Sequence, residues 1–385
     1  MIERTVYSAE HEDFRRSYRH FLETRIRPNH ARYEAQGYVD HEMWLEAGRE
    51  GFLCPTMPEE FGGAGADRGF PAVMLEEQGH AGLEGPGFSL HSDIVAPYIL
   101  GYGSAAQKQA FLPKMATGEM IGAIAMTEPG TGSDVQAIAT TAVEDGDDFI
   151  INGSKIFITN GFTCHFAIVA CKTGPKDGGA SAISLVILEA DRPGFGKAER
   201  PLHKMGMKAQ DTSELFFDNV RVPQTNLLGP LNGGFKLLMH ELAWERMQIA
   251  LWCVPAARAA FEESVAYAAQ RKTFGKPLHA HQDVRFKLAH MRAEISVAQS
   301  YVDDCLRQLL TGSLAADDAA MAKYWTTEMY SRVADTAVQI HGGYGYMWEY
   351  PVAHRYAEAR VKRIYGGTSE IMKEVIARGI TFPSH

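Results

Sequence analysis

Several features that define other protein classes are scarce or missing in this sequence of 385 residues. The five cysteines are scattered and form no C-x-x-C pair, which argues against a disulfide framework and a zinc site. Acidic residues outnumber basic ones by 47 to 38, and the net charge of −9 disfavours a general nucleic-acid binder. No apolar run approaches the roughly eighteen residues of a membrane-spanning helix. No internal repeat or low-complexity tract is present.

The N-terminal stretch also lacks the marks of a targeting segment. It has no apolar core of the secretory type, and acidic residues recur from Glu3 onward, which does not suit a mitochondrial presequence. Scattered thiols suit a reducing compartment. We therefore expect a cytoplasmic protein without a membrane span.

The hydrophobic pattern that is present changes its period twice along the chain. Apolar residues recur at helical spacing up to about Met120, strand-like runs follow to about Leu228, and long helical patterns resume from Gly233. A chain of this length is expected to hold two or three domains. The sequence therefore predicts an α+β protein with an all-α N-terminal domain (1–120), a middle antiparallel β domain (121–230) and a C-terminal helical bundle domain (231–385).

Three local signals predict where individual elements end. Pro28, after Arg27, predicts the end of the first helix. Asn152-Gly153 lies between two runs of β-branched and aromatic residues, which is typical of a β-hairpin turn. Pro255 separates two helical patterns, at 235–252 and 255–270, and predicts two separate helices there.

The most distinctive stretch is MTEPGTGSD, residues 126–134, which follows an apolar run. Its glycines, Gly130 and Gly132, let a ligand approach the backbone closely. Hydroxyl groups, including those of Thr127 and Ser133, lie beside backbone N–H groups, and this chemistry can hold a polar or phosphorylated cofactor. The alternative is a plain turn closed by its own Asx and hydroxyl hydrogen bonds. Residue types alone leave both interpretations open.

A carboxylate interrupts the apolar face of the first C-terminal helix. Leu238, Leu242, Ile249 and Trp252 form a stripe at helical spacing, and Glu245 fills the gap in it. An ionised carboxylate on a core-facing stripe is costly unless it is paired or functional. In an apolar site its pKa would rise, which suits a general base working near neutral pH. The alternative is a structural ion pair with a distant cation.

Three further clusters lie in the C-terminal region. The segment RKTFGK (271–276) gathers cations around an aromatic ring and could hold a pyrophosphate, or else be a solvated turn. The segments QIHGGYGY (339–346) and YGGTSE (365–370) are Gly-rich turns beside helix ends, where free N–H groups can bind an oxyanion or a phosphate. Each could also be a simple helix cap.

Motifs of other enzyme classes are incomplete. Trp244 stands where the H-E-x-x-H zinc motif that begins at His240 needs its second histidine. The segment GFSLH (87–91) lacks the last glycine of a serine nucleophile elbow. The segment GTGSDV (130–135) lacks the third glycine of a dinucleotide-binding fingerprint. A metal enzyme, a triad hydrolase and a Rossmann dehydrogenase are therefore disfavoured, and we expect no metal site.

Taken together and in this order, four of these segments resemble the acyl-CoA dehydrogenase family of flavoproteins over nearly the whole chain. They are MTEPGTGSD (126–134), RKTFG (271–275), QIHGGYG (339–345) and IYGGTSE (364–370). Thr131 departs slightly from the family pattern, and Phe157 stands where many relatives have Trp. The resemblance implies FAD bound between the β domain and the C-terminal bundle of a homotetramer.

The resemblance also implies which residues hold the ligands. Those expected at the flavin ring and its pyrophosphate are Met126, Thr127, Gly132, Ser133, Phe157, Ile158 and Thr159. Those expected to reach the FAD of a neighbouring subunit are Arg271, Phe274, Gln282, Gln339, Gly342 and Gly343. Thr368 and Glu370 would close the site near the flavin. Those expected along the acyl-CoA are Ser133, Leu242, Arg246, Tyr365, Gly366 and Gly367.

The position of the base separates branches of this family. Many members carry a catalytic Glu directly after the Tyr of a Tyr-x-Gly-Thr turn, where this sequence has Gly366. The long-chain and isovaleryl branches place the base on the helix that opens the bundle and follow it with Arg, as in Glu245-Arg246. The resemblance thus implies that Glu245 removes the α proton of a fatty acyl-CoA, while the Gly366 N–H binds the thioester carbonyl.

The implied reaction yields a trans-2-enoyl-CoA and reduced FAD, and an electron-transfer flavoprotein would take the electrons. A first alternative is an acyl-CoA oxidase-like flavoprotein whose reduced flavin reacts with O₂. A second is a catalytically silent family member that binds acyl-CoA without chemistry.

Overall fold

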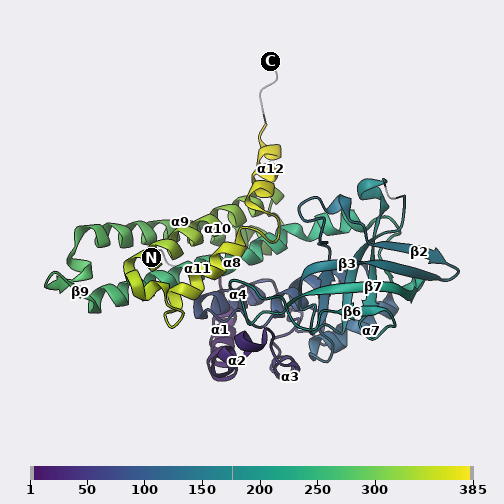
Figure 1. Ribbon diagram of the computed structural model, residues 1–385, viewed down its shortest axis with the longest axis horizontal. Helices are drawn as coiled ribbons and strands as arrows, with labels where there is room; N and C mark the ends of the chain where they lie inside the picture. Colours follow the sequence, from purple (N-terminus) through teal and green to yellow (C-terminus); the bar gives the residue numbers. More distant parts are fainter. Residues whose placement is uncertain (1–3, 176, 382–385) are drawn as a thin grey trace, which may run out of the picture.

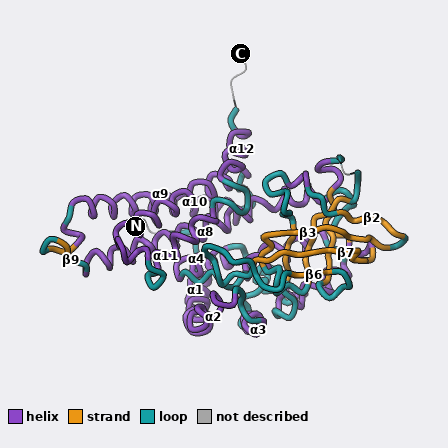
Figure 2. Tube along the Cα trace, viewed as in Figure 1, coloured by secondary structure: helices purple, strands orange, loops and turns teal. Residues whose placement is uncertain are grey.

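The computed structural model describes residues 4–175 and 177–381 (Figure 1). A β-sheet lies at one end of the molecule, long helices extend to the other end, and the N-terminal helices lie beside both (Figure 2). The predicted order of helical, β and helical regions is confirmed, and so is the α+β class. Both predicted domain boundaries, after residues 120 and 230, fall between elements and stay predictions. Within the described ranges, every helix is too short or too polar to span a lipid bilayer.

The N-terminal region is helical up to Ala116. Its helices are α1 (Ala9–Phe21), α2 (His30–Gln36), α3 (His41–Arg49), α4 (Gly69–Ala81), α5 (Phe88–Leu90), α6 (Ala96–Tyr102) and α7 (Ala105–Ala116). The predicted helix end at Pro28 is wrong, because a π-helical segment and a 3-10 turn (Arg27–Asn29) carry the helical path into α2. Pro28 lies near the start of that turn, where its missing N–H removes no necessary hydrogen bond.

The middle region is an eight-stranded sheet in the order β6-β7-β3-β2-β4-β5-β8, with β1 beside β4. The strands are β1 (Gly122–Ala125), β2 (Thr141–Asp145), β3 (Asp148–Thr159), β4 (Phe166–Lys172), β5 (Ile183–Glu189), β6 (Phe195–Lys197), β7 (Thr212–Pro223) and β8 (Leu227–Leu228). Most neighbours are antiparallel, as predicted, whereas β1 runs parallel to β4. Ile168 and Ala170 of β4 pack with α6 and α7, and Ala167 and Val169 belong to the core on the other face.

The hairpin predicted at Asn152-Gly153 is wrong. Strand β3 runs through both residues, and the turn between β2 and β3 lies instead at Gly146, whose φ is +63°. Gly153 occupies a register shift against β7, where an added Cβ would come within 2.4 Å of Oγ1 of Thr140. This glycine therefore permits a close approach within the sheet, a role that a local sequence pattern does not distinguish from a turn.

The C-terminal region is a bundle built around one long helix. Its helices are α8 (Gly234–Gln270), α9 (Gln282–Leu310), α10 (Ala316–His341), α11 (Pro351–Lys362) and α12 (Ser369–Gly379), and a short hairpin of β9 (Lys272–Thr273) and β10 (Lys276–Pro277) follows α8. The two helices predicted around Pro255 form one helix of 37 residues. A proline inside a helix costs about 3 kcal/mol. Burial of Pro255 and its neighbours among α4, α9, α10 and α11 offsets this penalty.

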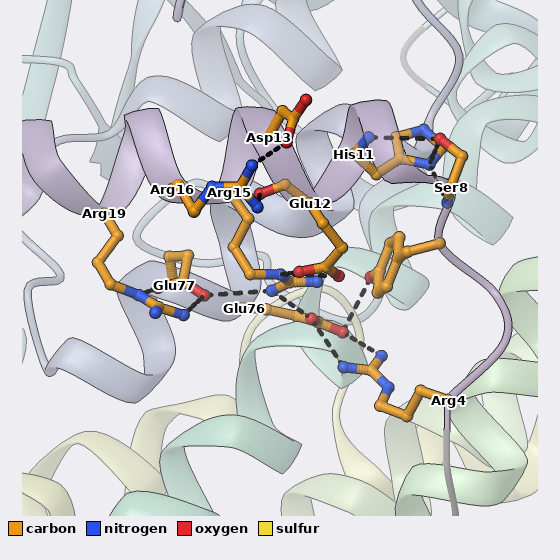
Figure 3. Close-up of polar contacts among 11 residues, drawn as sticks. Arg4, Ser8, His11, Glu12, Asp13, Arg15, Arg16, Arg19, Glu76 and Glu77 are labelled. Atoms are coloured by element: carbon orange, nitrogen blue, oxygen red, sulfur yellow. Dashed lines mark hydrogen bonds and ion pairs between the residues drawn. The ribbon is translucent and has the colours of Figure 1, made fainter.

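A network of ion pairs links Arg4 and helix α1 to α4 (Figure 3), and also links Arg4 to α9. Figure 3 shows Arg4 beside Glu76 of α4, to whose Oε1 it donates at 2.6 Å. Arg4 also donates to Oδ1 of Asp303 in α9, at 2.7 Å. Arg15 of α1 donates to Glu76 at 2.9 Å and to Glu77 at 3.2 Å. Glu76 and Glu77 are buried, so each needs these guanidinium partners.

We expect Arg4→Ala to lower the midpoint of thermal unfolding by several degrees. Asp303 and Glu76 would lose charged hydrogen bonds worth about 2 kcal/mol together. Circular dichroism during heating measures the shift. Arg16→Ala is the matched control, because Arg16 is exposed and its side chain pairs with Asp13 on the same helix. An equal shift of the unfolding midpoint in both variants would contradict this stabilising role of Arg4.

Candidate active site

Glu245 lies on α8 with its side chain in the core, as the apolar stripe predicted. In the described part of the chain, its carboxylate accepts one hydrogen bond, from the Tyr98 hydroxyl of α6 at 3.4 Å, and forms no ion pair. Burial raises the pKa of Glu245 to about 7, the charge of Glu241 acts in the same direction, and Tyr98 and Arg246 oppose them. A carboxylate with this pKa can accept a proton near neutral pH.

The turn that contains Gly366 lies against the same helix. Gly366 and Gly367 adopt positive φ values of +65° and +89°, a conformation that favours glycine. A Cβ added to Gly366 would come within 2.5 Å of Cδ1 of Ile249, one helical turn after Glu245. Among the residues described, the Gly366 N–H donates to no other group. The turn therefore offers a free donor close to the face of α8 that carries Glu245.

The residues after this turn begin α12, which packs against α10. Thr368 caps the helix, since its hydroxyl accepts a hydrogen bond from the Ile371 N–H at 3.3 Å. Glu370 is exposed in the first turn, and its pKa is lowered by hydrogen bonds from its own backbone N–H and from Thr368. Both side chains thus have local roles at the helix start, beside the Gly366 turn.

A buried ion pair holds the loop of residues 126–134 against β3. Lys155 of β3 donates to the Met126 carbonyl at 2.9 Å and to Oε1 of Glu128 at 2.8 Å. Glu128 and Thr131 exchange two backbone hydrogen bonds, of 2.9 and 3.0 Å, which close a tight turn. Backbone bonds, the ion pair and a hydrogen bond from the Thr131 hydroxyl to the Ala137 carbonyl at 3.2 Å therefore shape the loop, so a hydroxyl bond of the kind that the plain-turn alternative requires is present.

Beyond that turn the loop is open. The N–H groups of Gly132 and Ser133 donate to no group within the described residues, and Ser133 is exposed. A Cβ added to Gly130 or Gly132 would meet nothing within 4 Å. Free N–H groups beside hydroxyls are the donor set that an anionic or flavin cofactor requires.

Phe157 presents an aromatic ring beside this loop. The Ile156 N–H donates to the Thr127 carbonyl at 3.0 Å, which joins β3 to the loop at this point. Phe157 has a φ of +61° and a side chain 64% exposed, whereas Ile158 next to it is buried and Thr159 is half-buried. Positive φ is strained for an aromatic residue, and such strain is concentrated at functional sites.

Packing brings the loop, the base and the Gly366 turn to one region. Met126 packs against the apolar cluster that contains Tyr98 of α6 and Leu238 of α8. Tyr98 contacts Glu245, and Ile249 on the next turn of α8 contacts Gly366. Leu242 lies half-buried on α8 between these positions. The start of α8 is thus the element that assembles the three parts.

The second set of predicted cofactor residues lies at the opposite end of the molecule (Figure 1). Phe274 lies at the tip of the β9–β10 hairpin and is 96% exposed. The Arg271 guanidinium lies over the Tyr344 ring at 6.0 Å, which joins the hairpin to the turn at 342–346. Gln282, Gln339, Gly342 and Gly343 are exposed near it. One chain therefore does not bring this set to the loop at 126–134.

Two residues of the site were absent from the sequence predictions. Tyr98 lies in an ordinary apolar helix, and no local pattern marks it as the partner of Glu245. Lys155 did carry a signal, because it occupies an inward position of a strand whose other inward residues are apolar. A buried lysine on a strand indicates a partner elsewhere in the fold.

The remaining clusters lie outside this region. All five cysteines are free and buried. Within residues 4–175 and 177–381, no three His, Cys, Asp or Glu side chains are grouped to hold a metal ion. A groove of about 780 Å³ runs between the N-terminal helices and the bundle, where Arg19, His80, Glu263 and Arg355 line it, and it includes neither Glu245 nor Gly366.

Comparisons with known proteins agree with the fold and the motifs. The N-terminal, middle and C-terminal domain models of acyl-CoA dehydrogenases match residues 8–119, 123–220 and 232–381. The chain is 50% identical to the mitochondrial long-chain specific acyl-CoA dehydrogenase of Sus scrofa, over 98% of this chain and 88% of that protein.

Solved structures show the same likeness. The crystal structure of an acyl-CoA dehydrogenase from Geobacillus kaustophilus is 45% identical, with a TM-score of 0.96 over 99% of this chain and 100% of that chain. A chain described under an electron transferring flavoprotein of Acidaminococcus fermentans is 33% identical, with a TM-score of 0.90 over 97% of this chain and 98% of that chain. The resemblance predicted from the four motifs is confirmed: the protein belongs to the acyl-CoA dehydrogenase family.

Proposed function

We propose that this protein oxidises a long-chain fatty acyl-CoA to the trans-2-enoyl-CoA, with FAD as its cofactor. The observation that carries the proposal is the juxtaposition of a buried carboxylate, Glu245, with a free backbone donor at Gly366. The 50% identity with the pig long-chain enzyme supports the chain-length class. The absence of a carboxylate at position 366 supports a base on α8.

The residues of the loop fit FAD. The free N–H groups of Gly132 and Ser133 would bind its polar groups, and Met126, Thr127 and Phe157 would lie along the flavin ring. Bound FAD would supply the hydride acceptor for the substrate β carbon. The protein contributes position, polarity and a dry site.

Two groups of the chain would carry out the proposed chemistry: the Gly366 N–H in the turn and the Glu245 carboxylate on α8. The Gly366 N–H would donate to the thioester carbonyl and stabilise the negative charge that develops on its oxygen. This polarisation makes the α proton more acidic, and the Glu245 carboxylate would accept that proton. Burial excludes water and keeps Glu245 basic enough for the transfer. Arg246, buried beside Glu245, would lie along the substrate with Ser133, Tyr365 and Gly367.

The rate constant of flavin reduction should rise with pH through about 7, the pKa of Glu245. Below this pKa the carboxylate is protonated and does not accept the α proton, so the rate should fall about tenfold for each pH unit. Rapid mixing of the FAD-loaded protein with acyl-CoA over a range of pH measures this limb. A rate that stays constant through neutral pH would contradict the assignment of the base.

A panel of CoA thioesters of increasing length tests the reaction itself. Bleaching of the flavin by saturated long-chain thioesters, with formation of the enoyl product, is the expected result. No bleaching by any of them would favour the silent, binding-only alternative. Re-oxidation should be fast with a one-electron acceptor and slow with O₂, and the reverse order would favour the oxidase-like alternative.

The partners and the assembly belong to the same proposal. We infer that an electron-transfer flavoprotein accepts the electrons. Because Arg271, Phe274 and Gln339 lie far from the flavin loop of their own chain, they would serve the FAD of a second copy in a homotetramer (Figure 1). The expected location is the cytoplasm, whereas the pig relative is described as mitochondrial. Light scattering of the purified protein measures the assembly.

A further inference from the structure

Lys323 of α10 is fully buried and contacts the Gly366 turn. Its exposed fraction is 0%, and its Nζ donates to the Gly367 carbonyl. Among the residues described, no other side chain donates to the backbone of residues 365–367, and Lys323 forms no ion pair. A buried ammonium group without a carboxylate partner is costly, which indicates a role that requires it.

The bond from Lys323 acts on a turn whose two glycines make no side-chain contacts of their own. Gly366 and Gly367 have no side chains, and both adopt positive φ. The helix that follows, α12, packs against α10, the helix that carries Lys323, and buries Ser369 and Met372. The bond from Lys323 therefore fixes the backbone that carries the Gly366 N–H.

The charge around Lys323 favours a developing anion at the turn. Arg246 and Cys253 face it from α8, Glu328 from its own helix and Glu370 from the start of α12. Glu328 is engaged elsewhere, with Arg363 and Ser369 at 2.8 and 2.7 Å. Two buried cations, Lys323 and Arg246, thus lie near the turn without a carboxylate bound to either.

We propose that Lys323 is a positioning residue for the dehydrogenation: it holds the turn so that the Gly366 N–H points at the thioester carbonyl, and its positive charge stabilises the enolate-like oxygen. This inference rests on the proposed function. Lys323 acts through the backbone and forms no bond with the substrate. Its removal should therefore weaken polarisation of the carbonyl more than it weakens binding.

A second buried lysine provides a matched control. Lys362, at the end of α11, has an exposed fraction of 2%, and its Nζ lies 4.1 Å from the centre of the Trp252 ring. It donates to no backbone group of residues 365–367 in the described chain. Lys323→Met and Lys362→Met thus remove the same charge near the same turn, and only the first removes the bond to Gly367.

The direct measurement is the infrared band of a bound thioester carbonyl. Trans-2-dodecenoyl-CoA with ¹³C at the carbonyl would be added to the FAD-loaded protein. The shift of the carbonyl band from its position in water would be compared between the wild type and the lysine variants. The shift should shrink in Lys323→Met, recover in Lys323→Arg, and stay unchanged in Lys362→Met. An unchanged shift in Lys323→Met would overturn the inference.

Kinetics supply a second readout. Loss of a direct oxyanion donor costs roughly 100-fold or more, so loss of the group that holds the donor should slow flavin reduction about tenfold, with a change in the dissociation constant of the substrate below about twofold. A weaker affinity with an unchanged reduction rate would overturn the inference, since it would indicate a role in binding alone.

The pH profile separates the charge from a purely structural role. Burial lowers the pKa of Lys323 to about 8. Above this value the ammonium loses its charge, so the wild-type reduction rate and carbonyl shift should both decline. The decline should be absent in Lys323→Met and present in Lys362→Met. If Lys323→Met does not fold, the wild-type carbonyl shift decides, and a shift that is constant above pH 8 overturns the inference.

The two proposals fail in different ways. If the wild-type protein shows no flavin bleaching with any acyl-CoA, the proposed function fails. If the wild type bleaches and Lys323→Met matches it in rate, carbonyl shift and pH profile, only the role of Lys323 fails.

Discussion

Replacing Glu245 by Gln should give a protein that retains FAD but whose flavin is reduced by acyl-CoA about 10³-fold more slowly, because a general base contributes a factor of this order. The amide has nearly the shape of the carboxylate and still accepts the Tyr98 hydrogen bond, so the fold and the flavin loop should be unaffected. Stopped-flow absorbance with a long-chain acyl-CoA measures the rate, and the flavin spectrum measures occupancy.

Glu241→Gln is the control for this variant. Glu241 is half-buried one turn earlier on α8 and accepts a hydrogen bond from Tyr102 at 2.9 Å. Its charge raises the pKa of Glu245, so its neutralisation should keep most of the activity and move the rising limb of the pH profile to lower pH. A Glu245→Gln protein that reduced its flavin at the wild-type rate would refute the assignment.

Moving the base to the turn should partly restore a protein that has lost Glu245. In a Glu245→Gly background, Gly366→Glu would place a carboxylate where many family members carry theirs. The structure predicts an obstacle, because a Cβ at Gly366 would lie 2.5 Å from Cδ1 of Ile249. The triple variant with Ile249→Ala should therefore reduce its flavin at least about tenfold faster than Glu245→Gly alone.

The control is Gly366→Ala with Glu245→Gly and Ile249→Ala. It carries the same backbone strain at positive φ, on the order of 1–3 kcal/mol, and the same space at position 249, but no carboxylate. It should show no recovery. Equal rates in the Glu and Ala versions would mean that the turn does not hold the substrate where a base at position 366 could act.

The hydrophobic period predicted the order of the three regions because burial on a helix face and on a strand face have different repeats. The local turn and helix-end signals failed where two different structures share one local pattern. Asn152-Gly153 is typical of a turn, yet Gly153 serves a close approach to Thr140. Pro255 weakens a helix, yet the four helices packed around α8 hold it continuous. Both decisions depend on neighbours that are distant in the sequence.

For the site, the sequence singled out Glu245 because a single charge on an apolar stripe requires an explanation. It also indicated the glycine-rich segments 126–134 and 365–370, which the fold brings to the region of α8. It did not reveal Tyr98 or Lys323, because each acts through a partner on another element, whereas Lys155 is marked by its inward position on a strand whose other inward residues are apolar. The family resemblance, and no pattern in the residues themselves, implied which motif residues serve the FAD of a neighbouring subunit, and the spatial separation of the two ends appears only in the folded chain (Figure 1).

The sequence by itself determined the family, the order of the regions and the candidate base, since these depend on residue types and their spacing. Only the tertiary structure decided that burial raises the pKa of Glu245 to about 7, and that buried lysines hold both the flavin loop and the Gly366 turn. The physical reason is that desolvation and long-range hydrogen bonds depend on what surrounds a group in space, and a local pattern does not contain that information.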